Sequence, residues 1–260
     1  MLNTNTKTRE FKFDSTHYIK ALFELMKPRV MSLAIFTCVV GFLIAPYKSV
    51  DYLFAILSIT AVALGSGAAG SLNCWYEADV DKVMSRTCLR PIPTGRLTKK
   101  EALIFGVISS FVSVVALYFF SNLMAASLLA LTILFYVFVY TIWLKRKTPQ
   151  NIVIGGAAGA LPPVIGWAIA TGSVSIEPII LFLIIFVWTP SHFWALSLFK
   201  SEDYKKANIP MLPVTSGVET TKKNIFVYSI LLFPVAIAPY YVDFLGIIYL
   251  LFSFPLSAYY

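Results

Sequence analysis

Charge is scarce in this sequence of 260 residues, because Asp, Glu, Lys and Arg together make up only 13% of it. Soluble domains carry about 25% of these residues. Hydrophobic residues reach 58%, which leaves too little polar surface to cover a water-soluble domain of this size. The same arithmetic excludes a disordered chain and a low-complexity fibre. The sequence therefore excludes an ordinary soluble protein.

Cysteine is equally sparse. The chain has three cysteines, Cys38, Cys74 and Cys88, and none of them forms a C-x-x-C pair. This spacing excludes a disulfide-stapled secreted module and does not resemble a zinc or redox site. We expect the three thiols to act as small apolar packing residues.

Long apolar runs account for most of the chain. A membrane-spanning helix needs about 20 predominantly apolar residues. Eight stretches approach this length, at about 30–47, 52–72, 102–120, 123–143, 152–171, 176–199, 225–242 and 244–260. The sequence thus predicts an all-α polytopic membrane protein, a bundle of eight transmembrane helices around a central cavity that opens to the cytoplasmic side. We expect residues 1–29 to form a retained cytoplasmic arm, with an interfacial helix around 17–27, and residues 30–260 to form one transmembrane domain.

The basic residues indicate an orientation. Of the 21 Lys and Arg residues, all but Lys48 fall in the N-terminal arm or in the loops after the second, fourth and sixth expected spans. The positive-inside rule places these segments, and hence the N-terminus, in the cytoplasm. The formal charge of +8 is then a topology signal that requires no nucleic acid. We assign Lys99, Lys100 and the run 145–147 to the same role.

An acidic cluster follows the second expected span. Asn73, Glu77 and Asp81 are four residues apart, which places them on one helix face, whereas Asp79 points elsewhere. Ionisable groups at the end of a membrane helix are costly and are usually functional. Such a row of oxygen ligands suits Mg²⁺, which prefers one or two carboxylates together with phosphate oxygens of a substrate. Solvation of a loop is the simpler alternative.

Arginines follow the acidic cluster directly. Arg86 and Arg90 precede Pro91 and Pro93, which end the helix and hold the basic loop near the acidic face. Guanidinium groups bind phosphate oxygens in a bidentate manner. The segment therefore predicts a site for magnesium and diphosphate.

A second polar segment follows the sixth expected span. Glu202 and Asp203 could hold a second Mg²⁺ opposite the first cluster, although such a pair is also common on surfaces. His192 lies one to two turns deeper, as a packing residue or as a contact to a bound ring. Aromatic residues near both segments form either an interfacial belt or a π-rich pocket for a carbocation, and they are Trp75, Tyr76, Tyr136, Tyr140, Phe193 and Trp194.

Small residues are concentrated in two stretches, 65–70 and 148–163. Close packing of helices explains both of them. Neither stretch is a phosphate-binding loop, because no strand precedes it and no Gly-Lys-Ser/Thr follows.

Four segments carry a resemblance to a known family. Residues 73–96, with N-x-x-x-E-x-x-x-D followed by R-T-x-x-R-P-x-P-x-G-R, resemble the first aspartate-rich motif of the UbiA-type intramembrane prenyltransferases. Residues 141–166, 188–198 and 203–213 resemble the branch of that family that farnesylates protohaem IX. The resemblance covers most of residues 25–215.

The resemblance implies a reaction and a set of roles. The reaction is transfer of farnesyl from farnesyl diphosphate to a vinyl group of haem B, with addition of water, to give haem O. The implied cofactor is Mg²⁺. The implied catalytic residues are Glu77, Asp81 and Asp203, and the implied metal ligands are these three together with Asn73. The implied diphosphate contacts are Asn73, Arg86, Arg90 and Tyr204. The implied haem-pocket residue is His192.

The resemblance also implies a setting. It places the chain in a lipid bilayer, the bacterial cell membrane, with farnesyl diphosphate and haem B as substrates. A haem A synthase or an oxidase-assembly protein is the candidate protein partner, and no nucleic acid is involved. Family members have nine spans, and we predict eight for this sequence.

Three other functions are compatible with parts of the sequence. An aromatic-acid prenyltransferase of quinone synthesis would share the first acidic motif, and product masses would distinguish the two enzymes. A transporter would also have many spans, but its ionisable groups lie near the membrane midplane, whereas these acids lie at one end of the spans. A haem-binding scaffold would not need the row from Asn73 to Asp81.

Overall fold

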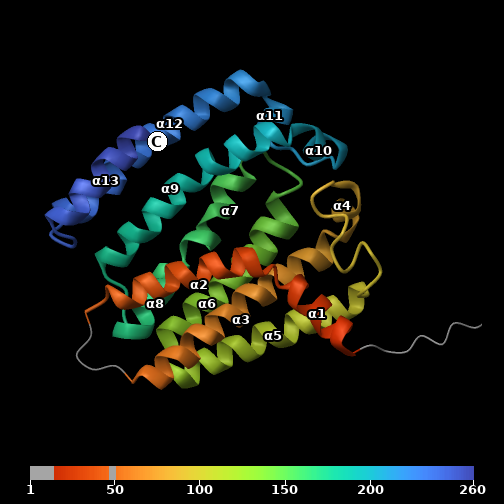
Figure 1. The fold of residues 1–260 in the computed structure, drawn as a ribbon, viewed down its shortest axis with the longest axis horizontal. Helices are drawn as coiled ribbons and strands as arrows, with labels where there is room; N and C mark the ends of the chain where they lie inside the picture. Colours follow the sequence, from red (N-terminus) through yellow and green to blue (C-terminus); the bar gives the residue numbers. More distant parts are fainter. Residues whose placement is uncertain (1–14, 47–50) are drawn as a thin grey trace, which may run out of the picture.

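The computed structural model describes residues 15–46 and 51–260, and within these ranges the regular structure is entirely helical. Figure 1 shows the helices as a bundle, with α12 and α13 along one edge. The elements are α1 (Ser15–Leu25), α2 (Pro28–Leu43), α3 (Tyr52–Tyr76), α4 (Ala78–Val83), α5 (Lys99–Phe120), α6 (Leu123–Leu134), the π-helix η1 (Phe135–Leu144), α7 (Asn151–Ala160), α8 (Pro162–Thr171), α9 (Ile176–Phe199), α10 (Ser201–Lys206), α11 (Leu212–Thr215), α12 (Gly217–Tyr241) and α13 (Ile247–Tyr259). The all-α membrane architecture is the predicted one.

The number of spans differs from the predicted eight. By length and composition, six helical stretches in the described residues can cross a membrane, formed by α3, α5, α6 with η1, α7 with α8, α9 and α12. The bent pair α1 and α2 would be a seventh. The eighth expected span, 244–260, is instead α13, with 13 residues. At 1.5 Å per residue α13 is about 20 Å long, shorter than the roughly 30 Å hydrocarbon core, so the count of eight is not confirmed.

The N-terminal helices belong to the bundle. Residues 1–14 of the expected arm lie outside the described residues, but α1 packs against α3 and α5 and buries Ala21 and Leu25. A bend of 55° separates α1 from α2. At this bend Lys27 has a φ of 55°, a left-handed conformation that is uncommon for a residue with a side chain. Part of the expected arm is therefore structural core.

Side-chain caps fix several helix starts. Asp51 accepts hydrogen bonds from the backbone of Leu53 and Phe54 at the start of α3. Thr98 and Glu101 form a reciprocal capping box at the start of α5. This box explains why α5 begins at Lys99, three residues before the apolar run that predicted it.

The backbones of helices α2 and α8 lie in direct contact. A Cβ atom at Gly41 would lie 2.1 Å from the carbonyl oxygen of Pro163, and one at Gly166 would lie 1.9 Å from that of Cys38. Only glycine permits this approach. Cys38 itself is fully buried in the main apolar cluster, and Cys74 is buried as well, as expected of packing residues.

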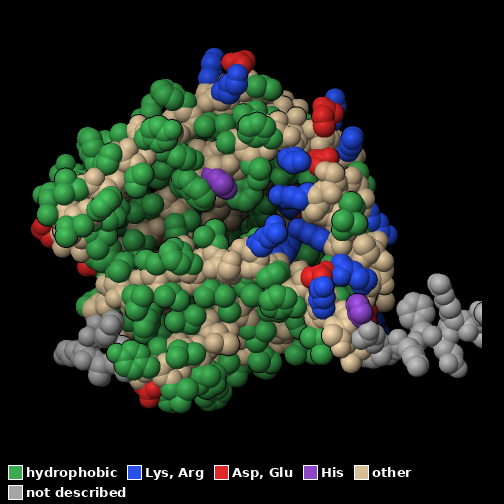
Figure 2. All heavy atoms as spheres, viewed as in Figure 1, with side chains coloured by type: hydrophobic (Ala, Val, Ile, Leu, Met, Phe, Trp, Pro, Cys, Tyr) green, Lys and Arg blue, Asp and Glu red, His purple; other side chains and the backbone are tan. Residues whose placement is uncertain are grey.

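The two long polar segments, 77–98 and 200–216, pack against each other. Tyr204, Ile209 and Met211 from the second segment form one buried cluster with Val80 and Met84 from the first. On the face shown in Figure 2, Lys and Arg side chains gather at one end of a hollow with largely hydrophobic walls. The fold thus brings the two segments singled out in the sequence to the same end of the bundle.

Candidate functional site: a paired-charge cluster at the end of an apolar cavity

The row of oxygen ligands lies at the junction of α3 and α4. Glu77 ends α3, but the backbone hydrogen bonds from Glu77 to Asn73 (2.9 Å) and from Asp81 to Glu77 (2.8 Å) continue across the junction. The helical spacing is therefore kept, and Asn73, Glu77 and Asp81 are all buried. The side chain of Asp79 is 58% exposed and points away from the other three.

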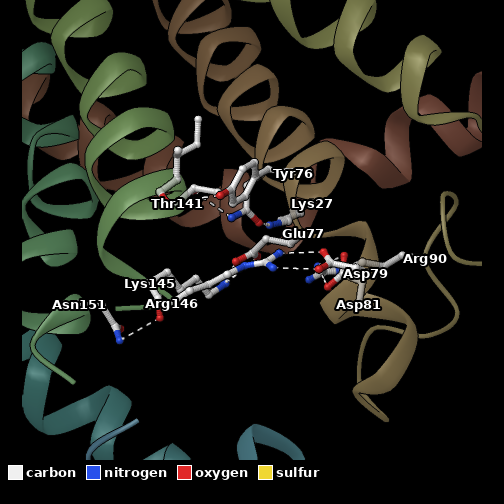
Figure 3. A network of polar contacts seen from close by, with 12 residues as sticks. Lys27, Tyr76, Glu77, Asp79, Asp81, Arg90, Thr141, Lys145, Arg146 and Asn151 are labelled. Atoms are coloured by element: carbon white, nitrogen blue, oxygen red, sulfur yellow. Dashed lines mark hydrogen bonds and ion pairs between the residues drawn. The ribbon is translucent and has the colours of Figure 1, made fainter. Parts of the chain in front are cut away.

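Each buried group in the row is held by a cation from a different segment. Lys27, at the bend between α1 and α2, donates to Asn73 Oδ1. Lys145, after η1, lies 2.6 Å from both carboxylate oxygens of Glu77. Arg90 donates from one nitrogen to both carboxylate oxygens of Asp81 at 2.8 Å. Figure 3 shows these side chains converging from the separate ribbons.

A second ion pair lies beside the first at the rim of the cluster. Arg146 makes a bidentate pair with Asp79 at 2.7 and 2.8 Å. Its guanidinium also lies over the ring of Tyr76, 5.2 Å from the centroid. Because Arg146 follows Lys145 and Asp79 is two residues from Glu77, the two pairs hold the end of η1 against α4 in a fixed register.

The charges of these pairs are mutually stabilised. Burial alone would raise the pKa of Glu77, but Lys145 and Lys27 hold it below its usual range. Burial alone would lower the pKa of Lys145, and the Glu77 carboxylate raises it above its ordinary value. At the rim, the hydrogen bonds from Arg146 lower the pKa of Asp79 to about 2. All four groups are therefore charged at neutral pH.

The π-helix η1 positions one side of the cluster. Extended π-helices are rare and are often found at functional sites. The backbone N–H of Lys145 bonds to the carbonyl of Tyr140, five residues earlier, at 2.9 Å. One turn of this winding presents both Lys145 and Thr141, whose hydroxyl accepts a hydrogen bond from the Asn73 amide at 3.0 Å. Both oxygen and nitrogen of the Asn73 side chain thus have partners.

The second predicted motif packs against the segment that carries this cluster. Asp203 accepts a hydrogen bond from Ser85 at 2.5 Å, and Tyr204 is buried among apolar side chains. Arg86 is exposed. His192 lies in α9 with its ring stacked on Trp188, the centroids 4.2 Å apart. The roles assigned to these four residues stay predictions.

Sequence analysis missed four members of the cluster, namely Lys27, Thr141, Lys145 and Arg146. We assigned Lys145 and Arg146 to topology, yet both hold acidic groups. The sequence does contain a signal for them. Buried acids at the end of one span need cations at the same level on neighbouring spans. Lys27 and Lys145 both adjoin apolar runs at that level.

An apolar cavity extends from the cluster into the bundle. Its volume is about 120 Å³, and Lys27 and Tyr136 belong to its lining. The other lining residues are Met26, at the bend before α2, and residues of α2, α3, α6, α7 and α8, almost all of them apolar, including Ala34, Val62, Leu129, Gly159, Pro162 and Ile165. A molecule with a charged head and an apolar tail therefore has a place for each part.

The donor set fits a magnesium ion carried by phosphate oxygens better than a preformed metal cage. Over residues 15–46 and 51–260, no three His, Cys, Asp or Glu side chains are arranged to hold a metal ion. Both carboxylate oxygens of Glu77 already contact a cation, the ammonium of Lys145 at 2.6 Å. The row nevertheless offers two buried carboxylates, Glu77 and Asp81, and Mg²⁺ needs only one or two carboxylates when phosphates supply further ligands.

Comparison with known proteins identifies the family. Residues 34–260 match the model of the UbiA prenyltransferase family. The chain is 62% identical to "Protoheme IX farnesyltransferase" of Pelagibacter ubique over 260 residues, which cover 100% of this chain and 86% of that protein. It is 56% identical to the protein of the same name from Parvibaculum lavamentivorans over 228 residues, covering 88% and 71%.

Solved structures show the same fold. A digeranylgeranylglyceryl phosphate synthase superposes with a TM-score of 0.77 at 21% identity, covering 93% of this chain and 84% of that chain. A UbiA homolog from Archaeoglobus fulgidus, bound to DMAPP and Mg²⁺, gives a TM-score of 0.74 at 19% identity, covering 92% and 83%.

Proposed function

The chain belongs to the UbiA prenyltransferase family, and from that premise we propose that it transfers farnesyl from farnesyl diphosphate to a vinyl group of haem B. The C–O bond of the donor breaks and diphosphate leaves. A C–C bond forms between the farnesyl C1 and the terminal vinyl carbon. Water adds to the other vinyl carbon and releases one proton, giving haem O. The names of the relatives support haem as the acceptor.

The paired-charge cluster is the observation that carries this proposal. A neutral vinyl carbon is a weak nucleophile, so the barrier is lowered mainly by stabilising the leaving diphosphate. Lys27, Lys145 and Arg90 lie at the same end of the cavity, where Lys27 donates to a buried amide oxygen and the other two each pair with a buried carboxylate. A bound diphosphate would offer these cations a second anion at the same place. Arg90 contacts Asp81 through a single nitrogen, and guanidinium groups bind phosphate oxygens as well as carboxylate oxygens.

We propose that Asn73, Glu77 and Asp81 hold Mg²⁺ when the donor binds. The ion would supply charge neutralisation for the departing oxygens. The burial of all three side chains on one continuous helical spacing supports this assignment. In the same proposal, Asp203 and Tyr204 approach the diphosphate from the second segment, and Arg86 contacts it from the exposed side.

Two tyrosines are placed to stabilise the allylic cation. Tyr136 lines the cavity, and its ring lies 5.3 Å from that of Tyr140. The ammonium of Lys145 lies 5.6 Å from the centroid of the Tyr140 ring, which shows that a cation is accommodated against this pair. Aromatic faces attract cations electrostatically, most strongly where water is excluded.

We propose that His192 contacts the haem acceptor. The imidazole is exposed on α9 and stacks on the ring of Trp188, which fixes the plane of the imidazole and leaves an outer aromatic surface. A planar porphyrin can stack on such a surface. This role differs from that of the cluster, since His192 would affect the acceptor and not the donor.

Product analysis tests the proposed reaction. Purified protein in lipid nanodiscs would be incubated with farnesyl diphosphate, Mg²⁺ and haem B, and in parallel with 4-hydroxybenzoate as an aromatic-acid acceptor. We expect a farnesylated, hydrated haem by mass spectrometry and no prenylated benzoate. Glu77→Gln and Asp81→Asn should abolish the product, as should chelation of Mg²⁺. Prenylation of the benzoate alone would favour the quinone-pathway alternative, and full activity of both variants would overturn the metal assignment.

The setting is part of the proposal. We place the protein in a bacterial cell membrane with its N-terminus in the cytoplasm and the charged cluster at the cytoplasmic end. Because haem O is apolar and membrane-bound, a haem A synthase or an oxidase-assembly protein is the candidate partner that receives it. Copurification of such a protein after crosslinking in membranes tests this partner.

A further inference from the structure

Three glycines on α7 differ in what surrounds them. A Cβ atom at Gly155 would lie 2.1 Å from the ring of Tyr140, and one at Gly156 would lie 3.0 Å from Thr189. Close helix packing therefore explains both of these glycines, as the sequence suggested. A Cβ atom at Gly159 would meet no atom within 4 Å.

Neither packing nor backbone conformation requires glycine at 159. Within a helix, glycine is about 1 kcal/mol less favourable than alanine. Gly159 lies inside α7 and is not among the residues with positive φ. It does line the apolar cavity. Gly159 is also exposed, so a side chain at this position would enter open space at the edge of the cavity, where the tail of a ligand would lie.

The position of Gly159 along α7 indicates which part of a ligand would reach it. α7 starts at Asn151, whose amide bonds to the carbonyl of Lys145 at the level of the charged cluster. Gly159 is eight residues farther along, a rise of about 12 Å. Each isoprene unit contributes four chain atoms, roughly 5 Å in extended form at C–C lengths of about 1.5 Å. From a diphosphate at the cluster, the third unit reaches this depth and the second does not.

The lining of the cavity agrees with an apolar tail that ends near Gly159. Apart from Lys27 and a few hydroxyl groups, its residues are apolar, among them Val62, Leu129 and Ile165. At its polar end lie Lys27 in the lining and, beside its partner Asn73, the buried ion pair of Glu77 with Lys145, a concentration of charge that suits a charged head group.

We propose that Gly159 is a specificity-determining residue that admits the third isoprene unit of the donor. With glycine at 159 the last unit of farnesyl diphosphate has space. A side chain there would occupy that space and would not affect the shorter geranyl diphosphate. This inference rests on the proposed function and names the residue that sets the donor length at its site.

Donor preference tests the role of Gly159. The ratio of kcat/KM for farnesyl to geranyl diphosphate would be measured with haem B for the wild type, Gly159→Ala and Gly159→Leu. We expect the ratio to fall stepwise, by at least about tenfold in Gly159→Leu, since overpacking penalises only the longer donor. Both variants should keep or raise the thermal stability, because each replaces a helical glycine.

A matched variant controls for added bulk on α7. Ile154→Phe enlarges an exposed side chain of the same helix, outside the cavity lining, and should leave the ratio unchanged. An unchanged ratio in a folded Gly159→Leu protein, or an equal loss with both donors, would overturn the proposal. Dissociation constants of the two diphosphates, measured by displacement of a fluorescent prenyl diphosphate, test the role of Gly159 without turnover. If the wild type forms no farnesylated haem, the proposed function fails, but this binding test of Gly159 still applies.

Discussion

Lys145 and Glu77 form a buried ion pair 68 residues apart in sequence, with the lysine nitrogen 2.6 Å from each carboxylate oxygen. The pair joins the end of one expected span to the end of another. Removing one partner of a buried pair leaves an uncompensated charge, which costs about 3–5 kcal/mol. Replacing both partners by neutral groups avoids that cost. Single and double substitutions of the pair should therefore differ in their effect on stability.

We expect Lys145→Met to lower the thermal stability strongly and to abolish farnesyl transfer. The double variant Lys145→Met with Glu77→Gln should regain much of the stability but none of the activity, because the site has lost a cation and a carboxylate. Thermal unfolding in detergent and product assays measure both. If the single variant were as stable as the wild type, the pair would not be the buried contact described above.

The rim pair of Arg146 and Asp79 should behave differently. Because Asp79 is exposed, its loss should cost at most about 1 kcal/mol of stability. Since its pKa is lowered to about 2, the pair's contribution is present above about pH 4 and is lost as the pH falls through about 2.

We expect Arg146→Gln to weaken donor binding, seen as a higher KM for farnesyl diphosphate, because the register of Lys145 depends on this neighbour. Arg146→Lys should retain part of the effect, since it keeps the charge but loses the bidentate contact. Lys222→Gln, which breaks the exposed pair with Glu219, is the matched control and should leave KM unchanged. Equal effects of the two Gln variants would contradict the positioning role.

Gly166 should not tolerate even one added carbon. In Gly166→Ala the new atom would lie 1.9 Å from a backbone oxygen of α2, so the two helices must separate. We expect destabilisation of at least about 1–3 kcal/mol, the usual cost of overpacking. Gly246→Ala is the control, because a Cβ atom there meets nothing within 4 Å and its φ is −75°.

His192→Ala should act on the acceptor. We expect a higher KM for haem B, with the dissociation constant of farnesyl diphosphate unchanged, because the ring lies on α9 and not in the charged cluster. The measurements are steady-state kinetics with varied haem and displacement binding of the donor. Loss of donor binding in a folded variant would assign His192 to the diphosphate site instead.

The thiol of Cys88 reports the orientation. Cys88 is half-buried in the loop after α4, whereas Cys38 and Cys74 are buried. In spheroplasts, a membrane-impermeant maleimide should label the protein only after lysis. A Cys88→Ala/Ser173→Cys variant moves the accessible thiol to the exposed turn after α8, at the opposite end, and should be labelled in intact spheroplasts. The reverse pattern would place the N-terminus outside.

The sequence predicted the spans well where apolar runs define them. α9 has the predicted bounds, 176–199. α12 begins at Gly217 and not near 225, because the helix continues into polar residues that an apolar scan does not see. α13 begins at Ile247 and not at the predicted 244, because the turn that separates it from α12, which includes Asp243 with a φ of 57°, extends to residue 246.

The site was predictable only where it is local in sequence. Asp81 and Arg90 are nine residues apart and were grouped from spacing alone. Lys27 lies 46 residues from Asn73, and its proximity depends on the bend between α1 and α2. Lys145 was missed because a basic residue next to a span has a sufficient explanation in topology, and only the packed bundle shows its partner.

The π-helical winding of η1 has a consequence for how substitutions on this span are chosen. A π turn joins residues five apart, so it takes up more residues than an α turn. A helical wheel drawn with α spacing through 135–144 therefore assigns Lys145 to the wrong face. A substitution chosen on this span from such a wheel would therefore be aimed at the wrong neighbour.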